Sequence, residues 1–334
     1  MVRHLAAAFV VSFLVAGYGE VPWPTVFYDF DDGQGTTVRD SGRAGNNGAF
    51  SGSLLAWSTT DGIYSGTSAG SRGCVRFLDS TWAPDHIQSP YIPEYNATSE
   101  YTISVWIRWS GAKNYGYLFW RVGTSHDMEP STGGDLYDAW ISPGPVKIMC
   151  TMETTISRMH HDVSAEVGSF NIFDGNWHWI VLSFKDMTQK VYGDGVELST
   201  FYLTDPPKGN TTDNLWLGAR PGRAGFPAEG VRMKGHMDRF RFWNQELTPE
   251  QITEIYQSEG PSGGTGTVVW TNRTVSVNQK MRQVASSQNH LKPVVFLPGA
   301  RAGQLPAKVY DARGRQVTRS SAPALRPSLL FCTK

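Results

Sequence analysis

Residues 173–198 constrain the fold of this chain more than any other part of its sequence. They open on a turn at 173–176 and continue as an aromatic and β-branched run at 177–184. In an extended chain, successive side chains point to opposite faces. Both faces of this run are then mostly apolar, with Trp177, Trp179 and Val181 on one and His178, Ile180, Leu182 and Phe184 on the other. The pattern predicts a central strand in a protein built from two packed sheets.

A hairpin signal follows this run. After a polar break at 185–189, Asp194-Gly195 separates two short runs of strand-like sequence. Asp-Gly in this position favours a type I′ turn, in which both central residues have a positive φ. The sequence therefore predicts a tight β-hairpin here.

Short strand-like runs separated by Gly- and Pro-rich turns recur along most of the chain. The clearest is 101–109, in which Ile103, Val105, Ile107 and Trp109 form a core face and Thr102, Ser104, Trp106 and Arg108 form the opposite face. Further strands are expected at 26–31, 73–79, 85–90, 118–122, 136–141, 146–150, 169–173, 215–218 and 235–244. Such spacing favours an all-β sandwich or jelly roll.

One short helix is expected at the end of this β-rich region. Thr248 is its predicted N-cap, Pro249 occupies the first helical position, and Gln251 completes a capping box. Leu247 and Ile252 are spaced to form a hydrophobic staple. The pair His160-His161, in contrast, is expected in a solvated loop.

Three segments resemble laminin-G-like (concanavalin A-like) jelly-roll domains. The opening segment, 27–48, contains Gly-Thr-Thr-Val, Asp-Ser-Gly and Asn-Asn-Gly. The central segment contains Asp-Gly-Asn-Trp-His-Trp and Tyr-Gly-Asp-Gly-Val. The last segment contains Met-Asp-Arg-Phe-Arg-Phe-Trp-Asn, followed by Leu-Thr-Pro-Glu-Gln-Ile. The resemblance covers about residues 24 to 258. It implies a jelly-roll sandwich whose first and last strands lie side by side, with one short C-terminal helix.

The chain divides into four predicted parts. Residues 1–20 have the charged start, apolar run and small residues of a signal peptide, and the apolar run is too short to span a bilayer. The jelly roll takes residues 21–259, a Gly-rich linker takes 260–266, and a small β-tail takes 267–334. Residues 308–317 resemble the sorting domains of the type IX (gliding-type) secretion system, although the chain ends differently, in Ser-Leu-Leu-Phe-Cys-Thr-Lys. The protein is therefore expected to be secreted or displayed at the cell surface.

The charge balance argues against nucleic-acid and anionic-membrane partners, and the cysteine content bears on disulfides and zinc binding. The chain has 30 Lys and Arg against 30 Asp and Glu, so it lacks the basic field that nucleic acids or anionic membranes require. Cys74, Cys150 and Cys332 make an odd number, and a Cys74–Cys150 disulfide is permitted in an exported protein. No cysteine pair has the spacing of a zinc site.

Aromatic and polar residues on expected strands are candidates for carbohydrate binding. A sugar site needs an aromatic platform with a few planar polar groups. Trp106, Trp120, Tyr137 and Trp140, with Arg108, Arg121 and Asp138, are expected on neighbouring strands that could line such a groove. The alternative is that these aromatic side chains belong to the core, and that Trp106 packs under a loop.

The resemblance also implies a structural Ca²⁺ where the first and last strands meet, since hard cations prefer oxygen ligands. The candidate ligands are Asp29, Asp31, Asp40 and Asp238. Alternatively, these acids cap turns or pair with neighbouring arginines.

Catalysis is not indicated by any motif. The Glu-x-Asp-x-x-Glu pattern of laminarinase-type jelly-roll hydrolases is absent, as are a Gly-x-Ser-x-Gly elbow and a His-Glu-x-x-His site. The sequence therefore predicts non-catalytic binding of an extracellular glycan or polysaccharide. Two alternatives stay open: a structural or adhesive surface protein that binds another protein, and a glycoside hydrolase or lyase with an unrecognised site.

Overall fold

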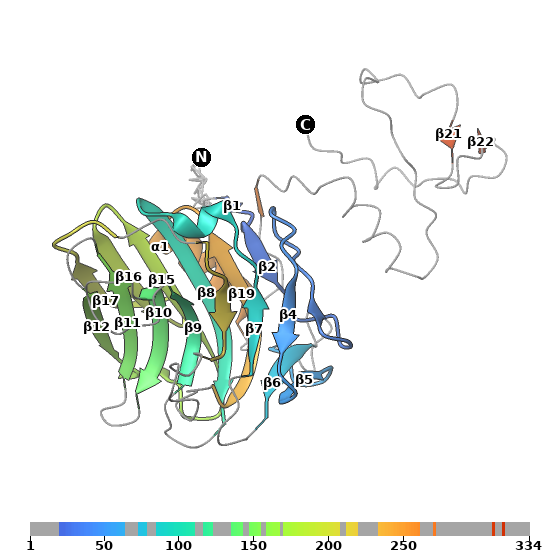
Figure 1. Ribbon diagram of the computed structural model, residues 1–334, viewed down its shortest axis with the longest axis horizontal. Coiled ribbons are helices and arrows are strands. Elements are labelled where there is room, and N and C mark those ends of the chain that lie inside the picture. Colours follow the sequence, from blue (N-terminus) through green and yellow to red (C-terminus); the bar gives the residue numbers. More distant parts are fainter. Residues whose placement is uncertain are drawn as a thin grey trace, which may run out of the picture. The chain divides into compact units, whose positions relative to one another are not determined.

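A computed structural model describes residues 20–63, 73–78, 85–110, 116–122, 135–142, 147–154, 158–167, 170–207, 212–219, 233–260, 270–271, 309–310 and 316–317. The chain separates into two compact units, residues 1–274 and 275–334. The described residues of the larger unit form two stacked antiparallel sheets and one α-helix, with smaller elements beside them (Figure 1). The predicted all-β jelly-roll sandwich is confirmed.

The two large sheets each have eight strands. In spatial order, the first sheet consists of β12 (Arg158–Ser164), β11 (Lys147–Glu153), β10 (Asp135–Ser142), β9 (Gly116–Val122), β18 (Leu215–Leu217), β7 (His86–Ser89), β4 (Gly48–Ser51) and β3 (Thr37–Val38). The second sheet consists of β17 (Val196–Tyr202), β16 (Thr188–Gly193), β15 (Trp177–Lys185), β8 (Glu100–Trp109), β19 (Gly235–Trp243), β6 (Cys74–Phe77) and β5 (Leu55–Ser58), with β2 (Val26–Tyr28) beside β19.

Smaller elements complete the described parts of the chain. In the larger unit, β1 (Val21–Pro22) pairs in parallel with β20 (Trp270–Thr271), and β13 (Glu166–Val167) pairs with β14 (Phe170–Asn171). Residues 270–271, which the sequence assigned to the tail, thus pair with a strand of the larger unit. A 3₁₀ turn, η1 (Pro93–Asn96), precedes β8. In the smaller unit, β21 (Val309–Tyr310) pairs with β22 (Gln316–Val317).

The centre of the second sheet contains the expected strand. β15 lies between β8 and β16, and all of its residues from Trp177 to Phe184 are buried. Ile180, Leu182 and Phe184 face the first sheet, where they join the main core with Ile103 and Ile107 of β8. The period-two pattern of the sequence therefore corresponds to two buried faces, one between the sheets and one behind the second sheet.

The first and last strands of the sandwich meet, as the family resemblance implies. Phe240 of β19 is opposite Tyr28 of β2, and the two rings stack with centroids 6.0 Å apart. A bulge in β19 near Arg239, whose φ is +47°, interrupts its pairing with β8. The far edge of β19 is therefore shared, with β6 pairing to its first half and β2 to its second half.

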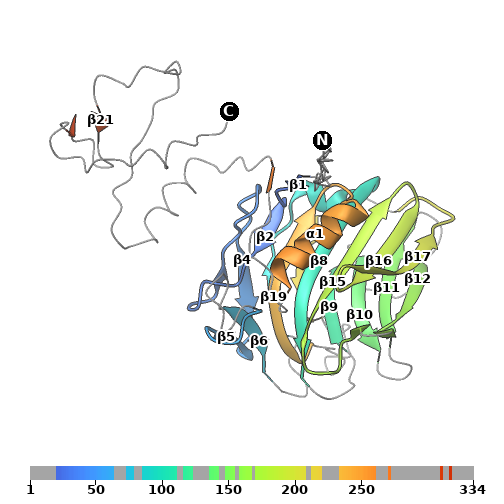
Figure 2. The ribbon, with the colours of Figure 1, turned by 180° about the vertical axis from the view of Figure 1, so that it is seen from behind.

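The helix α1 (Pro249–Glu259) lies on the outer face of the second sheet, over β8 and β15 (Figure 2). It starts at the predicted capping box, in which Thr248 accepts a hydrogen bond from the backbone of Gln251 and the Gln251 side chain accepts one from the backbone of Thr248. Leu247, just before the helix, and Ile252, within it, are both fully buried. The helix therefore supplies an apolar cover that the outward-facing tryptophans of this sheet require.

The predicted hairpin turn also meets this helix. Asp194 and Gly195, with φ of +51° and +80°, form the turn between β16 and β17. A Cβ at position 195 would lie 3.0 Å from Cβ of Tyr256 on α1. Glycine is required there both for the left-handed backbone and for the close approach of the helix.

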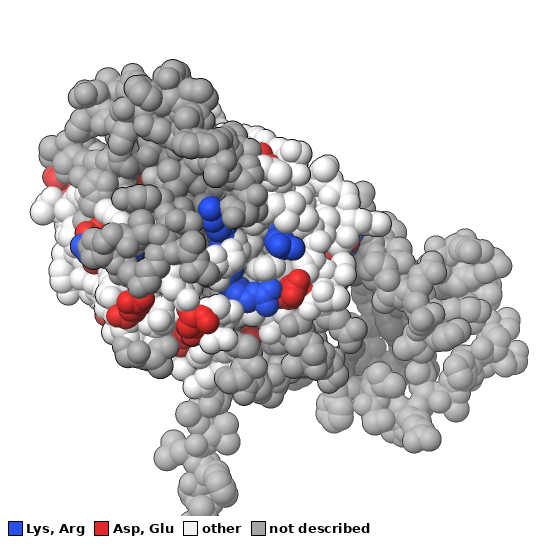
Figure 3. Space-filling model, turned by 90° about the horizontal axis from the view of Figure 1, so that it is seen from below, with Lys and Arg blue, Asp and Glu red and all other residues white. Residues whose placement is uncertain are grey.

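Charged side chains of opposite sign lie near one another on the described surface of the end of the sandwich in Figure 3. No helix among the described residues is long and apolar enough to cross a membrane.

Candidate functional site

The outer face of the first sheet has a cluster of aromatic side chains outside the main core. Tyr117 and Trp120 of β9 form this cluster, and Trp140 of β10 and Trp216 of β18 pack against them. We call these four residues the aromatic face. Residues 118 and 119 point the other way and join the core between the sheets. Three adjacent strands thus place a row of flat rings on one side of the sheet.

A β-bulge creates this arrangement. In the pairing of β9 with β10, Ala139 is opposite Phe119 but the next residue, Trp140, is opposite Tyr117. Leu118 is therefore the additional residue on β9. An additional residue in one strand changes the alternation beyond it. As a result, Tyr117 and Trp120 share a face although their separation of three residues would place them on opposite faces of a regular strand.

The rings of the aromatic face support one another in two groups. Tyr117 and Trp140 are stacked, with centroids 5.9 Å apart and planes at 24°. Trp120 meets Trp216 edge-on at 5.8 Å, and the ring of His86 stacks on Trp216 at 3.5 Å with a 4° angle between the planes. Trp120 is 6% exposed, whereas Trp140 and Trp216 remain half-buried. The accessible platforms are therefore Trp140 and Trp216, with Trp120 between them.

Polar residues are in register with these rings. Asp138 of β10 is opposite Trp120 and is fully buried. Gln88 of β7 is opposite Trp216 and is half-buried. The face thus combines flat apolar rings with the partly accessible amide of Gln88, which are components expected of a sugar site, while the carboxyl group of Asp138 is buried beside Trp120.

The predicted carbohydrate site is only partly assembled. Trp120, Asp138 and Trp140 lie together, and Tyr137 belongs to the same strand as the last two, although its side chain lies outside the described residues. Trp216, Tyr117 and His86 were not predicted. The alternation Leu215-Trp216-Leu217 was a usable signal for Trp216, since it places the indole opposite to two core leucines. The bulge that turns Tyr117 outward had no comparable signal.

The expectation that Trp106 and Arg108 share this surface is wrong. Both residues belong to β8 of the second sheet, while Trp120 and Trp140 belong to the first. Trp106 is fully buried and stacks on Trp179 at 6.0 Å and on Tyr256 of α1 at 5.8 Å. It packs under the helix, not under a loop. Arg121, on β9, is also fully buried and donates hydrogen bonds to the carbonyl of Tyr95 and the side chain of Asn96.

The acids proposed for calcium are largely engaged with backbone amides. Asp40 accepts hydrogen bonds from the backbone N–H groups of Phe27, Gly42 and Asn46. Asp31 accepts one from Gly73, and Asp29 accepts one from the hydroxyl of Ser41. These contacts correspond to the alternative in which the acids stabilise turns.

Asp238 differs from the other three acids. It is fully buried on β19, where Oδ2 accepts a hydrogen bond from the N–H of Ile63 and Oδ1 is buried without a hydrogen bond. Burial raises the pKa of Asp238 well above its ordinary value. Among the described residues, no three His, Cys, Asp or Glu side chains are grouped as metal ligands. Calcium binding therefore stays a prediction, which melting temperatures in Ca²⁺ and in EDTA can test.

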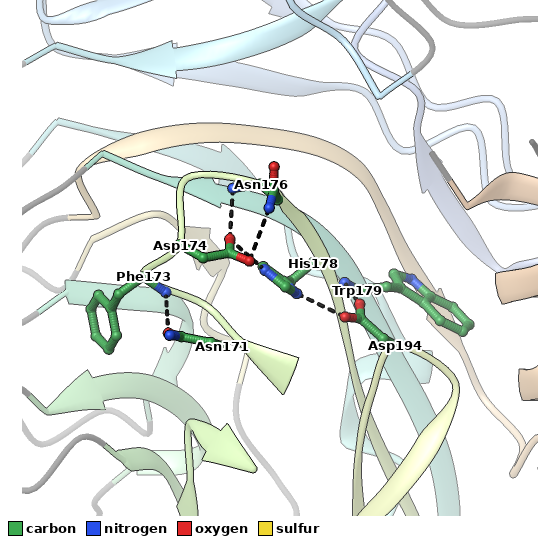
Figure 4. A network of polar contacts seen from close by, with 7 residues as sticks. All are labelled: Asn171, Phe173, Asp174, Asn176, His178, Trp179 and Asp194. Carbon is green, nitrogen blue, oxygen red and sulfur yellow. Dashed lines mark hydrogen bonds and ion pairs between the residues drawn. The ribbon is translucent and has the colours of Figure 1, made fainter. Parts of the chain in front are cut away.

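A charged network fastens the turn before β15 to the β16–β17 hairpin (Figure 4). His178 lies between two carboxylates, with Nδ1 2.7 Å from Oδ2 of Asp194 and Nε2 2.9 Å from Oδ1 of Asp174. Asp174 also accepts hydrogen bonds from Asn176, and Asp194 from the N–H of Trp179. Burial alone would lower the pKa of His178, but its bonds to Asp194 and Asp174 raise it above the ordinary value. The network is structural, because the imidazole is 6% exposed and both of its nitrogens are engaged.

Two further sequence expectations are corrected by the structure. The His160-His161 pair lies on β12 and not in a loop; the ring of His161 is buried, stacks on Phe201 and is 2.8 Å from Oγ of Ser199 on β17. It therefore joins the edges of the two sheets. Cys74 and Cys150 are free and buried in different sheets, so no disulfide joins them. Cys332 lies outside the described residues.

Comparison with known proteins agrees with this geometry. The family model for Laminin_G_3, the concanavalin A-like lectin/glucanases superfamily, matches residues 83–253, just over half of the chain. The chain belongs to this superfamily. No curated protein is similar to it at the threshold of the comparison.

Several solved structures are similar to this chain at low sequence identity. The binding domain of Paraclostridial Mosquitocidal Protein 1 has a TM-score of 0.50 and 13% identity over 71% of this chain and 52% of its own. Domain 4 of AbnA, a GH43 extracellular arabinanase from Geobacillus stearothermophilus in complex with arabinotriose, has a TM-score of 0.47 and 18% identity over 71% of this chain and all of its own. The receptor-binding domain of botulinum neurotoxin mosaic serotype C/D has 0.46 and 13%, over 70% and 50%. The chain therefore spans about half the length of the two toxin domains.

Proposed function

We propose that residues 21–259 bind an extracellular glycan without catalysis, through the aromatic face. The observation that carries this proposal is the row of Trp216, Trp120 and Trp140 on three adjacent strands, of which the two outer rings remain half-buried on a sheet face outside the main core. A single exposed aromatic side chain is common, but a contiguous apolar patch on a domain surface is typical of a site that contacts a ligand or a partner.

The chemistry of the face suits a sugar chain. Neighbouring strands lie about 5 Å apart, so the Cα atoms of Trp216 and Trp140, which are two strands apart, are separated by at least ~10 Å. One sugar ring cannot cover both indoles, whereas a short run of rings can. Gln88, which is half-buried, provides an amide group beside the rings for hydrogen bonds to hydroxyls. We therefore infer that the ligand is an oligosaccharide or polysaccharide segment that crosses the strands.

Binding to immobilised neutral polysaccharides tests the proposal. We expect Trp140→Ala and Trp216→Ala each to weaken binding by about tenfold, since the loss of a stacking aromatic contact costs on the order of 1–1.5 kcal/mol. Tyr202→Ala is the matched control, because this substitution removes an aromatic ring far from the aromatic face. Tyr202 is 71% exposed and lies on β17 of the second sheet. Unchanged binding in both tryptophan variants would overturn the proposal.

The same panel separates the other functions. Release of reducing sugar would favour the glycosidase or lyase alternative. No binding to any polysaccharide, together with capture of a defined surface protein that depends on Trp216, would favour an adhesive role.

We also propose that the protein is exported, on the basis of the signal-peptide pattern of residues 1–20 and the sorting-domain pattern of residues 308–317. Loss of the protein from the extracellular fraction on deletion of either segment tests each pattern separately.

A further inference from the structure

A row of basic residues crosses the outer face of the second sheet, away from the aromatic face. His236 of β19 is opposite Arg76 of β6 on one side and opposite Arg108 of β8 on the other. Trp177 of β15 continues the row beyond Arg108. The inward-facing neighbours Val75 and Met237 belong to the main core, so the four side chains of the row share the outer face.

The two arginines differ in their partners. Arg108 forms an ion pair with Asp61 at 3.3 Å, and its guanidinium lies over the ring of Trp177, 5.3 Å from the centroid. The second carboxylate oxygen of Asp61 accepts a hydrogen bond from Ser58. Arg76 is exposed, and within the described part of the chain its side chain has no ion pair or hydrogen bond.

The row places more positive charge than negative charge on a small area. Arg76 and Arg108 are not opposite each other, since β19 lies between their strands, and both guanidinium groups can therefore face one bound anion. Burial, together with the nearby arginines, lowers the pKa of His236 to about 4. The imidazole is therefore neutral at pH 7 and does not add a third like charge. Among the described residues, the ion pair of this row is the one between Asp61 and Arg108.

The geometry fits an oxyanion. Arg76 and Arg108 are separated by one strand, so their Cα atoms are about 10 Å apart, and long side chains from both can reach one bound group. Guanidinium groups bind carboxylates and sulfates through paired charge-assisted hydrogen bonds. His236 lies between them in the register of the strands, and Trp177 offers an apolar border.

We propose that Arg76 and Arg108, on either side of His236, bind the carboxylate or sulfate group of an acidic polysaccharide at a second site of this domain. In the free protein, Asp61 forms an ion pair with Arg108. When the acidic polysaccharide binds, its anionic group replaces Asp61 as the partner of Arg108. Two arginines opposed by one aspartate are too few for a nucleic-acid backbone, where binding scales with the number of neutralised phosphates. An acidic sugar chain needs only one such contact for each charged group.

Affinity measurements on the full chain with polygalacturonate, dextran sulfate and neutral dextran test this site. We expect Arg76→Ser to weaken binding of the acidic polymers by about tenfold or more, which is the worth of a hydrogen bond to a charged group. Asp61→Asn should strengthen it, because Arg108 loses its internal competitor while the amide still accepts from Ser58. Preference for polygalacturonate or for dextran sulfate identifies the anion.

Lys185→Gln is the matched control. Lys185 is 45% exposed at the end of β15, and the variant removes one positive charge from the same sheet at another position. An equal loss in Lys185→Gln and Arg76→Ser, or weaker binding in Asp61→Asn, would overturn the proposal, as would an absence of acidic-polymer binding. Trp216→Ala separates the two sites, because it should reduce binding of neutral glycans and leave acidic-polymer binding intact.

Discussion

The two outer faces of this sandwich are built from similar residues but differ in how far their tryptophans are covered. The second sheet presents Trp106, Trp177 and Trp179 outward, and the first sheet presents Trp120, Trp140 and Trp216. Over the second sheet, α1 places Tyr256 against Trp106 and Trp179, which are both fully buried. On the first sheet, Trp140 and Trp216 remain half-buried.

This difference shows that the role of an outward-facing tryptophan depends on whether another element of the fold packs over it. Burying a large aromatic side chain stabilises a domain by a few kcal/mol, and α1 realises that gain for the second sheet. A partly exposed indole forgoes part of the gain, which binding of a ligand can recover. The tryptophans under α1 are accordingly structural, and the aromatic face is the candidate for stacking on a glycan.

The sharpest test of the comparison is a pair of substitutions. We expect Trp106→Ala to lower the free energy of unfolding by about 3–5 kcal/mol, since it leaves a large cavity beneath α1. Trp216→Ala should cost less than about 1 kcal/mol, because its indole is already partly hydrated. Guanidinium-induced unfolding of both variants checks this. Equal losses in the two variants would contradict the assignment of one face to the core and the other to binding.

The attachment of α1 provides the next largest effect. Glu259, 2% exposed at the end of the helix, is 2.6 Å from Nη2 of Arg241 and 2.8 Å from Nη1 of Arg239. Burial alone would raise the pKa of Glu259, but the two arginines hold it below its ordinary value.

We expect Glu259→Gln to destabilise the domain by about 3 kcal/mol, because it removes the buried carboxylate that pairs with the guanidinium of Arg241 at 2.6 Å. Chemical unfolding measures the loss. Glu250→Gln, on the exposed first turn of the same helix, is the control and should change stability little. If glycan binding disappeared in a Glu259→Gln protein that remained folded, the separation of the two faces would be wrong.

A smaller effect concerns pH and belongs to the covered side of the sandwich. The pKa of His178 is raised in the folded state, so its stabilising contribution is complete below the unfolded value of about 6.5 and is lost as pH rises through the folded value. The pKa values of His161 and His236 are lowered in the folded state, so the folded protein loses stability at these two residues as pH falls below about 6.5.

Comparison of wild type with His178→Gln isolates this contribution. The stability difference between the two proteins should shrink as pH rises above 6.5, as measured by melting temperature across pH 5.5 to 9 (roughly one unit below to well above the ordinary histidine pKa). A difference that does not change with pH would mean that His178 is neutral in its network.

Much of the architecture was already determined by the sequence. Alternation at Trp177–Phe184 predicted a strand with two buried faces, Asp194-Gly195 predicted the hairpin, and Thr248 with Gln251 predicted the start of α1. These signals are local: a period of two, a positive φ and a capping hydrogen bond depend on residues close together in the chain. They require no knowledge of what packs against them.

Only the tertiary structure decided which tryptophans face one another and which are covered. Trp106 and Trp120 both lie on strands rich in large apolar side chains, yet they belong to different sheets. The bulge at Leu118 and the position of α1 set the difference, and the pairing of Arg76, His236 and Arg108 depends on strands far apart in the sequence. Burial and cross-strand register are properties of contacts between distant segments, and a single strand carries no record of its neighbours.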